Sequence, residues 1–355
     1  MKHRIIPALL SGGAGRRLWP ASTQARPKQF HAFAGPRTLI QETALRAAGE
    51  HGALSFAPPI VLANAAHADL AEAQLAEIGI APAALVLEPM GRNTAATAAL
   101  AAALAAEIEP EAKVLLLPAD HIVRDVGAFH AALLRAAPAA QSRIVTFGVT
   151  PDRPETGYGY IKRGAALSEG VYAIEAFKEK PDAQLAQSYL VHGGYAWNAG
   201  MFFFTPAVLL REFAASADIR DLALAALAQA KRKGARVLLS QEAFARVPAL
   251  PLDIAVMEKT QLGAVAPADI GWADLGAWDE IWRLAEKDAA GNALHGDALA
   301  LDARGNLLRS DGPSLAVLGV DDLIVIAHEG RIVIAPRARA QEVKRLLEAS
   351  EKAQR

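Results

Sequence analysis

Short apolar runs alternate with longer stretches of helical periodicity over the first 150 residues, and this alternation constrains the fold more than any other feature of the chain. A strand, a helix and a second strand at this spacing form a βαβ unit, so the pattern predicts an α/β fold whose mainly parallel sheet has helices on both faces. The expected strands are 5–10, 59–63, 84–88, 113–118 and 143–148, and the expected helices are 39–50, 66–78, 94–107 and 126–137.

The pattern changes after residue 150, where turn-rich β segments and shorter helical stretches replace the regular alternation. We predict a large domain over 1–288 and a small all-β unit with a terminal helix over 289–355. Because so small a unit has a marginal core, we expect it to pack against the large domain or against a second copy in a homodimer. The expected helices are 206–215, 221–232, 276–287 and 337–351, and the four or five expected β runs include 298–302, 314–319, 323–327 and 331–335.

The composition excludes several kinds of site and partner. The chain has no cysteine, which removes disulfides, zinc–thiolate sites, iron–sulfur clusters and cysteine nucleophiles together. Its net charge of −1 argues against nucleic acid and anionic membranes as partners. No apolar stretch reaches the roughly 20 residues that span a bilayer, and the short apolar run near the start resembles a signal peptide only superficially. We therefore expect a cytoplasmic protein with no membrane contact.

Basic charge is concentrated at the start of the chain. Between Met1 and Gln41 there are seven lysines and arginines and no acidic residue, whereas the rest holds 30 basic and 38 acidic residues. Such a local positive field suggests a small anionic ligand, although a solvated basic face has the same composition.

A glycine-rich loop follows the first expected strand. Gly12, Gly13 and Gly15 have no Cβ, so their backbone N–H groups can approach phosphate oxygens closely. A dinucleotide-binding loop is excluded, because Leu18 stands where that loop needs a third glycine and the second strand ends without an acidic residue. A P-loop is excluded because no Gly-Lys-Ser/Thr follows. The loop predicts a phosphate site of another kind, and a plain tight turn is the alternative.

The residues of this loop and those after it carry a family resemblance. The segments 12–22 (GGAGRRLWPAS) and 26–30 (RPKQF) resemble the signature of the sugar-phosphate nucleotidyltransferases, and of the mannose-1-phosphate guanylyltransferases among them. The resemblance implies a Rossmann-like catalytic domain followed by a left-handed β-helix-like unit. Further motifs follow in the order of the family, namely 88–95 (EPMGRNTA), 118–121 (PADH), 154–161 (PETGYGYI), 177–181 (FKEKP), 197–202 (WNAGMF), 253–258 (DIAVME) and 271–278 (GWADLGAW).

Four positions depart from the residues usual in that family. Arg16 stands in place of a small hydroxyl residue, Thr23 of an arginine, Ala96 of a proline and Ile254 of a tyrosine. None of the four is expected to take part in the chemistry, so the departures bear on fine nucleotide contacts and not on the reaction.

The resemblance implies transfer of GMP from GTP to mannose 1-phosphate, which gives GDP-mannose and pyrophosphate. The attacking phosphate oxygen is already an anion, so no general base is required and charge neutralisation is the main task. Arg17 would hold the leaving pyrophosphate through its planar fork, and Lys28 would neutralise the α-phosphate. A surface arginine and a solvated lysine are the alternative interpretations.

The resemblance also implies a Mg²⁺ ion held by Asp120 and Asp274, since a hard divalent cation takes oxygen ligands. Without the resemblance, Asp120 at the end of a strand would be interpreted as a helix cap. The nucleotide-binding residues that the resemblance implies are Gly12, Gly13, Gly15, Glu88, Arg92 and Asn93. For Asn93, capping of the alanine-rich helix is an alternative role.

On the sugar-phosphate side, the resemblance implies four residues from three motifs. Lys180 would bind the phosphate, and Glu179 the sugar hydroxyls, with Asn198 and the backbone of Gly159 completing the pocket. A simple ion pair between Glu179 and Lys180 is the alternative interpretation.

Two other functions remain open at this point. One is a nucleotidyltransferase with another sugar phosphate or nucleoside triphosphate. The other is an inactive sugar-nucleotide-binding regulatory subunit, which would be expected to lose Arg17, Lys28, Asp120 or Asp274, all of which are present.

Overall fold

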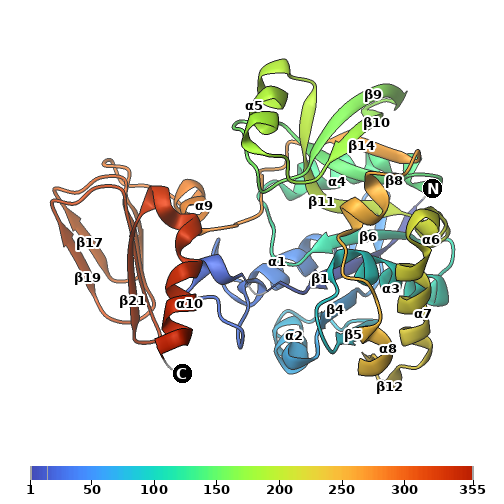
Figure 1. The fold of residues 1–355 in the computed structure, drawn as a ribbon, viewed down its shortest axis with the longest axis horizontal. Coiled ribbons are helices and arrows are strands. Elements are labelled where there is room, and N and C mark those ends of the chain that lie inside the picture. Colours follow the sequence, from blue (N-terminus) through green and yellow to red (C-terminus); the bar gives the residue numbers. More distant parts are fainter. Residues whose placement is uncertain (1, 14, 354–355) are drawn as a thin grey trace. The chain divides into compact units, whose positions relative to one another are not determined.

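The chain folds into two compact units, and the computed structural model describes residues 2–13 and 15–353 (Figure 1). Unit 1 comprises residues up to 12 together with 40–272, and unit 2 comprises 13–39 together with the residues from 273 onward. The glycine-loop segment therefore belongs to the same unit as the C-terminal part of the chain. The division of the sequence near residue 288 stays a prediction.

Unit 1 is built on one large sheet whose centre is parallel. In the order β13, β5, β4, β1 and β6, neighbouring strands all run parallel. Beyond β6 the sheet continues through β11, which pairs antiparallel with both β6 and β8. The predicted parallel α/β core is confirmed, and the later strands extend it with mixed direction. The strands are β1 (His3–Ser11), β2 (Glu50–His51), β3 (Leu54–Phe56), β4 (Ile60–Asn64), β5 (Ala84–Glu88), β6 (Lys113–Pro118), β8 (Ile144–Val149), β9 (Tyr160–Ser168), β10 (Val171–Lys178), β11 (Tyr195–Phe204), β12 (Lys231–Lys233), β13 (Arg236–Leu238) and β14 (Gly263–Pro267).

The helices of unit 1 cover both faces of this sheet. The chain runs outward from β1 to β4 and β5, and then returns across them to β6 through α3. Since such crossovers are right-handed, α2 on the outward path and α3 on the return path lie on opposite faces. The helices are α1 (Leu39–Arg46), α2 (Ala68–Glu77), α3 (Asn93–Ile108), α4 (Val126–Ala136), α5 (Ala183–His192), α6 (Pro206–Glu212), α7 (Ala217–Ala228) and α8 (Gln241–Ala245), with a short π-helix at Asp253–Met257.

The alanine-rich helix α3 is the buried centre of unit 1. Every residue from Ala95 to Ala102 is buried, and α3 contacts β1, β4 and β6 on one side and α6 and α7 on the other. Small side chains let the sheet and these helices approach α3 closely, and alanine also has the highest helix propensity. No helix within the described residues is long and apolar enough to cross a membrane.

The C-terminal part of unit 2 is a small β-helix-like module. Strands β16, β18 and β20 pair in parallel, β17 pairs in parallel with β19, and β21 adds antiparallel to β20. The predicted all-β unit is confirmed, with six strands where four or five were expected. Its elements are β16 (Ala293–His295), β17 (Ala298–Leu301), β18 (Leu307–Ser310), β19 (Leu315–Leu318), β20 (Leu323–His328) and β21 (Arg331–Pro336), preceded by α9 (Trp278–Leu284) and followed by the 3-10 helix η7 (Arg337–Glu342) and α10 (Lys344–Ala353).

Two expected helices end differently in the structure because of glycine turns. The helix expected at 39–50 stops at Arg46, and Gly49 and Gly52 adopt positive φ angles that lead into the β2–β3 hairpin. The helix expected at 221–232 runs instead over Ala217–Ala228, and β12 and β13 form a hairpin around Gly234 with φ of 57°. Glycine adopts these left-handed conformations without the steric cost of a Cβ.

Candidate active site

The parallel core of unit 1 has a topological switch point between β1 and β6. The chain leaves β1 toward one edge of the sheet and reaches β6 from the other side, so the crevice beyond their carboxyl ends is the expected ligand site. The two ends are in register, since Leu10 pairs with Pro118 and the Ala119 N–H donates to the Leu10 carbonyl over 2.9 Å. Gly12 and Asp120, predicted from separate motifs, therefore emerge next to each other at this edge.

Asp120 is followed by a histidine that is fixed on both sides. The His121 Nε2 atom lies 3.9 Å from Asp120 Oδ1, and the Trp272 indole N–H donates to His121 Nδ1 over 3.2 Å. Behind this turn, the buried Arg46 donates to the His121 carbonyl over 3.2 Å. Burial lowers the pKa of Arg46 to about 10, which leaves its guanidinium charged at neutral pH. The Asp120 carboxylate thus projects from a rigid turn with a permanent positive charge beneath it.

The predicted sugar-side residues of unit 1 meet at one point. A Cβ on Gly159 would lie 2.8 Å from Glu179 Oε2 and 3.3 Å from the Asn198 Cβ. The Asn198 N–H also donates to the Gly159 carbonyl over 2.8 Å. Glycine at 159 is therefore required by close approach, and residues from the 154–161, 177–181 and 197–202 motifs form one cluster there.

Asn198 is held by a buried polar chain that also contains Asp253. The Asn198 amide donates to Asp253 Oδ1 over 2.8 Å, and Asn198 Oδ1 accepts from the Thr146 hydroxyl over 2.7 Å and from the Gly200 N–H over 3.2 Å. These partners fix which way the amide points. Burial and the neighbouring Glu179 carboxylate raise the pKa of Asp253 to about 7.

Lys180 adopts an unusual backbone conformation beside the cluster of Gly159, Glu179 and Asn198. Its φ is 44°, in the left-handed region that costs a non-glycine residue roughly 1 kcal/mol or more, so the surrounding structure must hold it there. The Lys180 Nζ lies 2.5 Å from Glu179 Oε1, and the backbone N–H of Glu179 donates to Glu258 Oε1 over 3.1 Å. The ammonium group remains exposed, whereas the Glu179 side chain is nearly buried. An exposed cation on a fixed backbone is suited to bind an anion.

The predicted nucleotide-side residues surround the start of α3. Glu88 ends β5 and is buried, and its Oε1 accepts from the Thr97 hydroxyl over 2.8 Å. Burial raises the pKa of Glu88 to about 7. Arg92 donates to the carbonyls of Phe244 and Ala245, at the end of α8.

Asn93 and Thr94 stand at the start of α3. Asn93 is the first residue of the helix with φ of 64°, and its Oδ1 accepts from the neighbouring Thr94 N–H over 3.0 Å. The Thr94 hydroxyl accepts from the Leu252 N–H over 2.9 Å, which ties the start of α3 to the segment before Asp253.

Three further predicted residues lie together in unit 2. The Lys28 Nζ donates to the Asp274 carbonyl and lies 3.6 Å from the Asp274 carboxylate. A Cβ on Gly276 would lie within 3.5 Å of both Asp274 Oδ1 and the Arg17 guanidinium, so these three residues share one small region. The Lys28 side chain is only 5% exposed, whereas the Asp274 side chain is 24% exposed. A buried lysine that is paired in this way holds its charge at a defined position.

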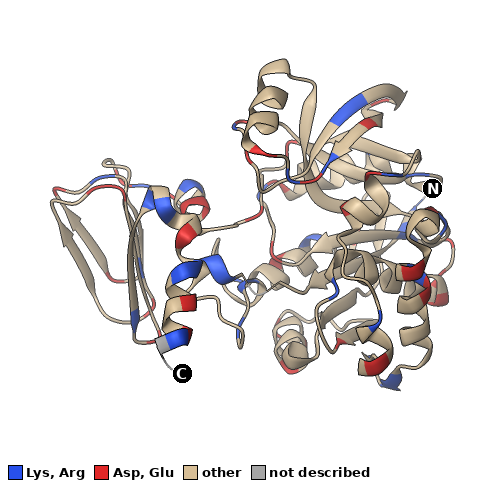
Figure 2. Ribbon diagram, viewed as in Figure 1, with Lys and Arg blue, Asp and Glu red and all other residues tan. Residues whose placement is uncertain are grey.

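Gly15 of the glycine loop packs directly against Lys28. Gly15 has φ of 59°, and a Cβ there would lie 2.6 Å from the Lys28 Cβ. In Figure 2 the short 3-10 helix η1 (Arg16–Leu18) that follows is blue, because two of its three residues are arginines. Arg17 Nη1 donates to the Gln341 side chain of η7 over 2.8 Å.

The family to which these motifs point is shown by comparison with known sequences. The sequence pattern described as "Nucleotidyl transferase" matches residues 6–291. The chain belongs to the nucleotidyl transferase family. A second pattern, described as "MannoseP isomerase/GMP-like beta-helix domain", matches residues 296–349 and covers the β-helix-like module.

Named relatives resemble this nucleotidyl transferase over nearly its whole length. It is 42% identical to the xanthan biosynthesis protein XanB of Xanthomonas campestris pv. campestris (strain B100), covering 97% of this chain and 72% of that protein. It is 37% identical to a mannose-1-phosphate guanylyltransferase of Klebsiella pneumoniae, covering 99% and 75%. A solved structure from Thermus thermophilus, titled mannose-1-phosphate geranyltransferase, is 32% identical with a TM-score of 0.84 and covers 99% of this chain and all of that one.

Each unit of this nucleotidyl transferase thus gathers its own share of the predicted residues. Unit 1 holds the predicted sugar-side residues, the nucleotide-side residues Glu88, Arg92 and Asn93, and Asp120. Unit 2 holds Arg17, Lys28 and Asp274. Within the described part of the chain, the structure forms no group of three His, Asp or Glu side chains suited to a metal. The roles of the individual residues stay predictions.

Asp253 is a functional candidate that sequence reasoning does not single out. Its segment 253–258 is one of the motifs, but nothing in the sequence shows that its first residue contacts Asn198 from a position 55 residues away. A carboxylate that opens a motif is the available signal, and the partner is visible only in the fold.

Proposed function

We propose that the chain transfers GMP from GTP to mannose 1-phosphate, giving GDP-mannose and pyrophosphate. The observation that carries the proposal is the cluster of Gly159, Glu179 and Asn198, beside the exposed Lys180 ammonium. This cluster with Lys180 offers a carboxylate, an amide and a cation, which are the groups needed to bind sugar hydroxyls and a phosphate. The names of the Klebsiella pneumoniae and Thermus thermophilus relatives supply the sugar, and the former also supplies the guanylyl group.

The reaction balances without an added acid or base. A phosphate oxygen of mannose 1-phosphate forms a bond to the α-phosphorus of GTP, and the bond from that phosphorus to the bridging oxygen breaks. Pyrophosphate leaves with the electron pair. Both the nucleophile and the leaving group are anions, so the protein contributes positioning and positive charge.

Arg17 and Lys28 are the groups that supply this charge in the proposal. Arg17 would bind the departing pyrophosphate with two N–H groups at a time. Lys28 would offset charge at the α-phosphate, and its burial makes that charge effective because little water screens it. Backbone N–H groups of Gly12, Gly13 and Gly15 would bind the triphosphate, with Glu88, Arg92 and Asn93 on the nucleoside side.

The side chains of Asp120 and Asp274 fit a magnesium ion by donor chemistry. Both are partly exposed carboxylates, which are hard oxygen donors of the kind that Mg²⁺ prefers. The ion, when bound, offsets phosphate charge and polarises the phosphoryl oxygens. A cation lies near each carboxylate, since the Lys28 Nζ is 3.6 Å from that of Asp274 and Arg46 donates to the carbonyl of His121, next to Asp120.

A nucleotidyl transferase with another sugar phosphate or nucleoside triphosphate is the second candidate. The cluster of Gly159, Glu179 and Asn198 with Lys180 would bind hydroxyls and a phosphate, and those groups are common to many hexose 1-phosphates. Selectivity for mannose therefore rests on the orientation that Thr146 and Asp253 give to the Asn198 amide.

Pyrophosphate release tests the proposed function directly. The full chain is supplied with Mg²⁺, one nucleoside triphosphate and one sugar 1-phosphate at a time, over panels of each. We expect the highest kcat/KM with GTP and mannose 1-phosphate, and GTP formation in the reverse direction from GDP-mannose and pyrophosphate. If another triphosphate is used about tenfold better, corresponding to about 1.4 kcal/mol, the guanylyl assignment is wrong.

Two further parts of the proposal concern the setting of the enzyme. We place the reaction in the cytoplasm because its substrate GTP is made and used there. We also propose a homodimer that covers part of the β-helix-like module, on which Leu299, Leu318 and Ile334 are each more than 55% exposed. Sedimentation of the full chain measures the oligomeric state, and a monomer at micromolar concentration would contradict this part.

A further inference from the structure

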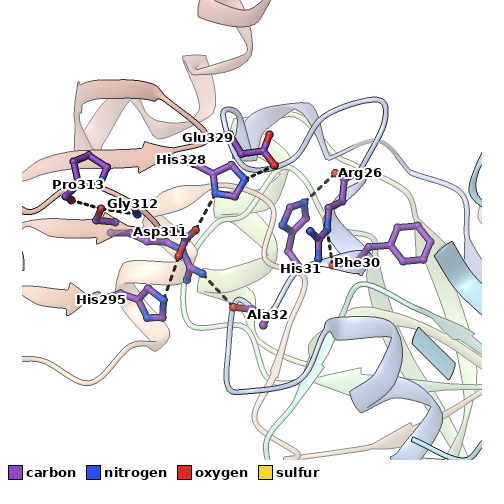
Figure 3. A network of polar contacts seen from close by, with 12 residues as sticks. Arg26, Phe30, His31, Ala32, His295, Asp311, Gly312, Pro313, His328 and Glu329 are labelled. Carbon is purple, nitrogen blue, oxygen red and sulfur yellow. Dashed lines mark hydrogen bonds and ion pairs between the residues drawn. The ribbon is translucent and has the colours of Figure 1, made fainter. Parts of the chain in front are cut away.

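Arg309 of the β-helix-like module reaches into the segment that carries Lys28. Arg309 lies on β18, and its Nη2 donates to the backbone carbonyl of Ala32 over 3.3 Å (Figure 3). Its guanidinium also lies 5.4 Å from the centre of the Phe33 ring, within cation–π range. A residue of the C-terminal module therefore holds the backbone four residues after Lys28.

The Arg309 side chain is itself fixed by a carboxylate. Asp311 lies on the turn after β18, and its Oδ2 is 3.5 Å from Arg309 Nε and 2.9 Å from His328 Nδ1. His295 Nε2 approaches the other oxygen at 3.6 Å. Figure 3 shows the His295 and His328 rings directed toward the Asp311 carboxylate. Arg309 is largely buried, and its partner Asp311 is also held by the two histidines. Its guanidinium therefore has little freedom to leave the Ala32 carbonyl.

The segment that Arg309 contacts is tightly coupled to Lys28. Lys28 opens the 3-10 helix η2 (Lys28–Phe30), and the His31 N–H donates to the Lys28 carbonyl over 3.1 Å. The His31 ring stacks on Phe33 with centroids 5.3 Å apart, and its Nε2–H donates to the Arg26 carbonyl over 3.0 Å. Movement of Ala32 and Phe33 would therefore be transmitted to the Lys28 backbone within one helical turn.

Phe33 also packs against an aromatic residue that lies close to Asp274 in the sequence. The Phe33 ring meets the Trp278 ring edge-on at 5.7 Å, and the Trp278 indole N–H donates to the Trp19 carbonyl over 2.9 Å. Trp278 lies four residues after Asp274, the partner of Lys28. Arg309, Phe33 and Trp278 thus form one cluster. We expect this cluster to position both Lys28 and Asp274.

We propose that Arg309 is a positioning residue for the transfer reaction, and that it acts through Lys28. The inference rests on the proposed function, in which Lys28 offsets charge at the α-phosphate. The β-helix-like module then contributes to turnover without touching substrate, by holding the Lys28 segment in its working geometry.

A double-mutant cycle tests this role, with Arg309→Met and Lys28→Ala alone and combined. We expect Arg309→Met to lower kcat about tenfold with KM for mannose 1-phosphate changed less than about twofold, because the sugar-side residues belong to unit 1. In the Lys28→Ala background, Arg309→Met should have almost no further effect on kcat. Equal losses of kcat in both backgrounds would show that Arg309 acts independently of Lys28, and would overturn the proposal.

Arg337→Met is the matched control for this experiment. Arg337 is an arginine of the same module that stacks on Trp282 at 3.6 Å, donates to the Gly305 carbonyl and pairs with Asp322, and all three partners lie outside the Lys28 segment. Its replacement should lower the melting temperature and leave kcat per folded molecule unchanged. If Arg337→Met lowered kcat as much as Arg309→Met does, the effect would be general destabilisation and the proposal would fail.

A conservative variant keeps the test informative if Arg309→Met does not fold. Arg309→Lys retains the charge beside Asp311 and loses the planar fork, so it should give a smaller loss of kcat that again vanishes in the Lys28→Ala background. Wild-type turnover is measured in the same assay. An inactive wild type would count against the proposed function. If the wild type is active but the losses of kcat from the Arg309 and Lys28 substitutions simply add, the result would count against the role of Arg309 alone.

Discussion

Gly15 and Lys28 approach so closely that a Cβ on residue 15 would lie 2.6 Å from the Lys28 Cβ. Gly15 also has φ of 59°, a conformation that favours glycine. Both the positive φ and the lack of space therefore require glycine at residue 15. Any side chain there would push against Lys28, which the proposal places at the α-phosphate.

Gly15→Ala is therefore expected to lower kcat, by about tenfold or more, because Lys28 or the loop must shift to admit the methyl group. Steady-state kinetics with GTP and mannose 1-phosphate would measure the loss. Gly35→Ala is the matched control, since a Cβ at residue 35 meets nothing within 4 Å. Full activity of Gly15→Ala would show that Lys28 tolerates displacement.

Lys180→Ala and Arg17→Ala should affect different kinetic constants. Lys180 is expected to bind the phosphate of the ground-state sugar, so its loss should raise KM for mannose 1-phosphate about tenfold with a smaller change in kcat. Arg17 is expected to meet charge that departs with pyrophosphate, so its loss should mainly lower kcat. An unchanged KM in Lys180→Ala would contradict this division of roles.

Replacement of Glu88 by glutamine should stabilise the protein at alkaline pH. Burial raises the pKa of Glu88 to about 7, whereas an unfolded glutamate titrates near 4.5. The folded state then holds more protons than the unfolded state between these values, so this group lowers the free energy of unfolding as pH rises from 4.5 to 7, by about 3 kcal/mol in total. Glu88→Gln keeps an oxygen for the Thr97 hydroxyl and removes that loss.

Thermal unfolding at pH 5 and pH 8 would measure the effect of Glu88→Gln. We expect its melting temperature to exceed that of the wild type at pH 8 by more than at pH 5. Glu111→Gln, at an exposed position, should show no such difference. Equal shifts at both pH values would mean that Glu88 titrates normally in the folded protein.

Removal of divalent cations should abolish turnover and leave the fold intact. Chelation with EDTA is expected to stop pyrophosphate release, and added Mg²⁺ to restore it, because phosphate charge is otherwise left uncompensated. Asp120→Asn and Asp274→Asn should each raise the Mg²⁺ concentration needed for half-maximal rate. Turnover that persists in the chelated enzyme would exclude the metal role.

The parallel core was predictable because its signal is local. Strands of apolar residues such as 84–88 and 113–118 are bounded by turns and appear in the structure with the same limits. The boundaries near Gly49 and Gly234 were missed because positive φ angles at these glycines turn the chain into hairpins, and tertiary pairing then overrides helix propensity.

The candidate site was predictable where a motif names its own residues, and not where a contact joins distant segments. Glu179, Lys180 and Asn198 were named in this way, and their roles stay predictions. The bond from Asn198 to Asp253, and that from Arg309 to Ala32, span 55 and 277 residues and depend on register that no local pattern encodes.

The make-up of unit 2 has a consequence for how the protein is synthesised. Residues 13–39 leave the ribosome before residues 40–272, but their packing partners begin at residue 273. At typical rates of elongation, residues 13–39 are synthesised on the order of tens of seconds before Trp278 and Arg309, against which they pack. A nascent or prematurely terminated chain can therefore complete its large sheet and still lack an ordered Lys28, so that competence for catalysis arrives only after Trp278 and Arg309 have been translated.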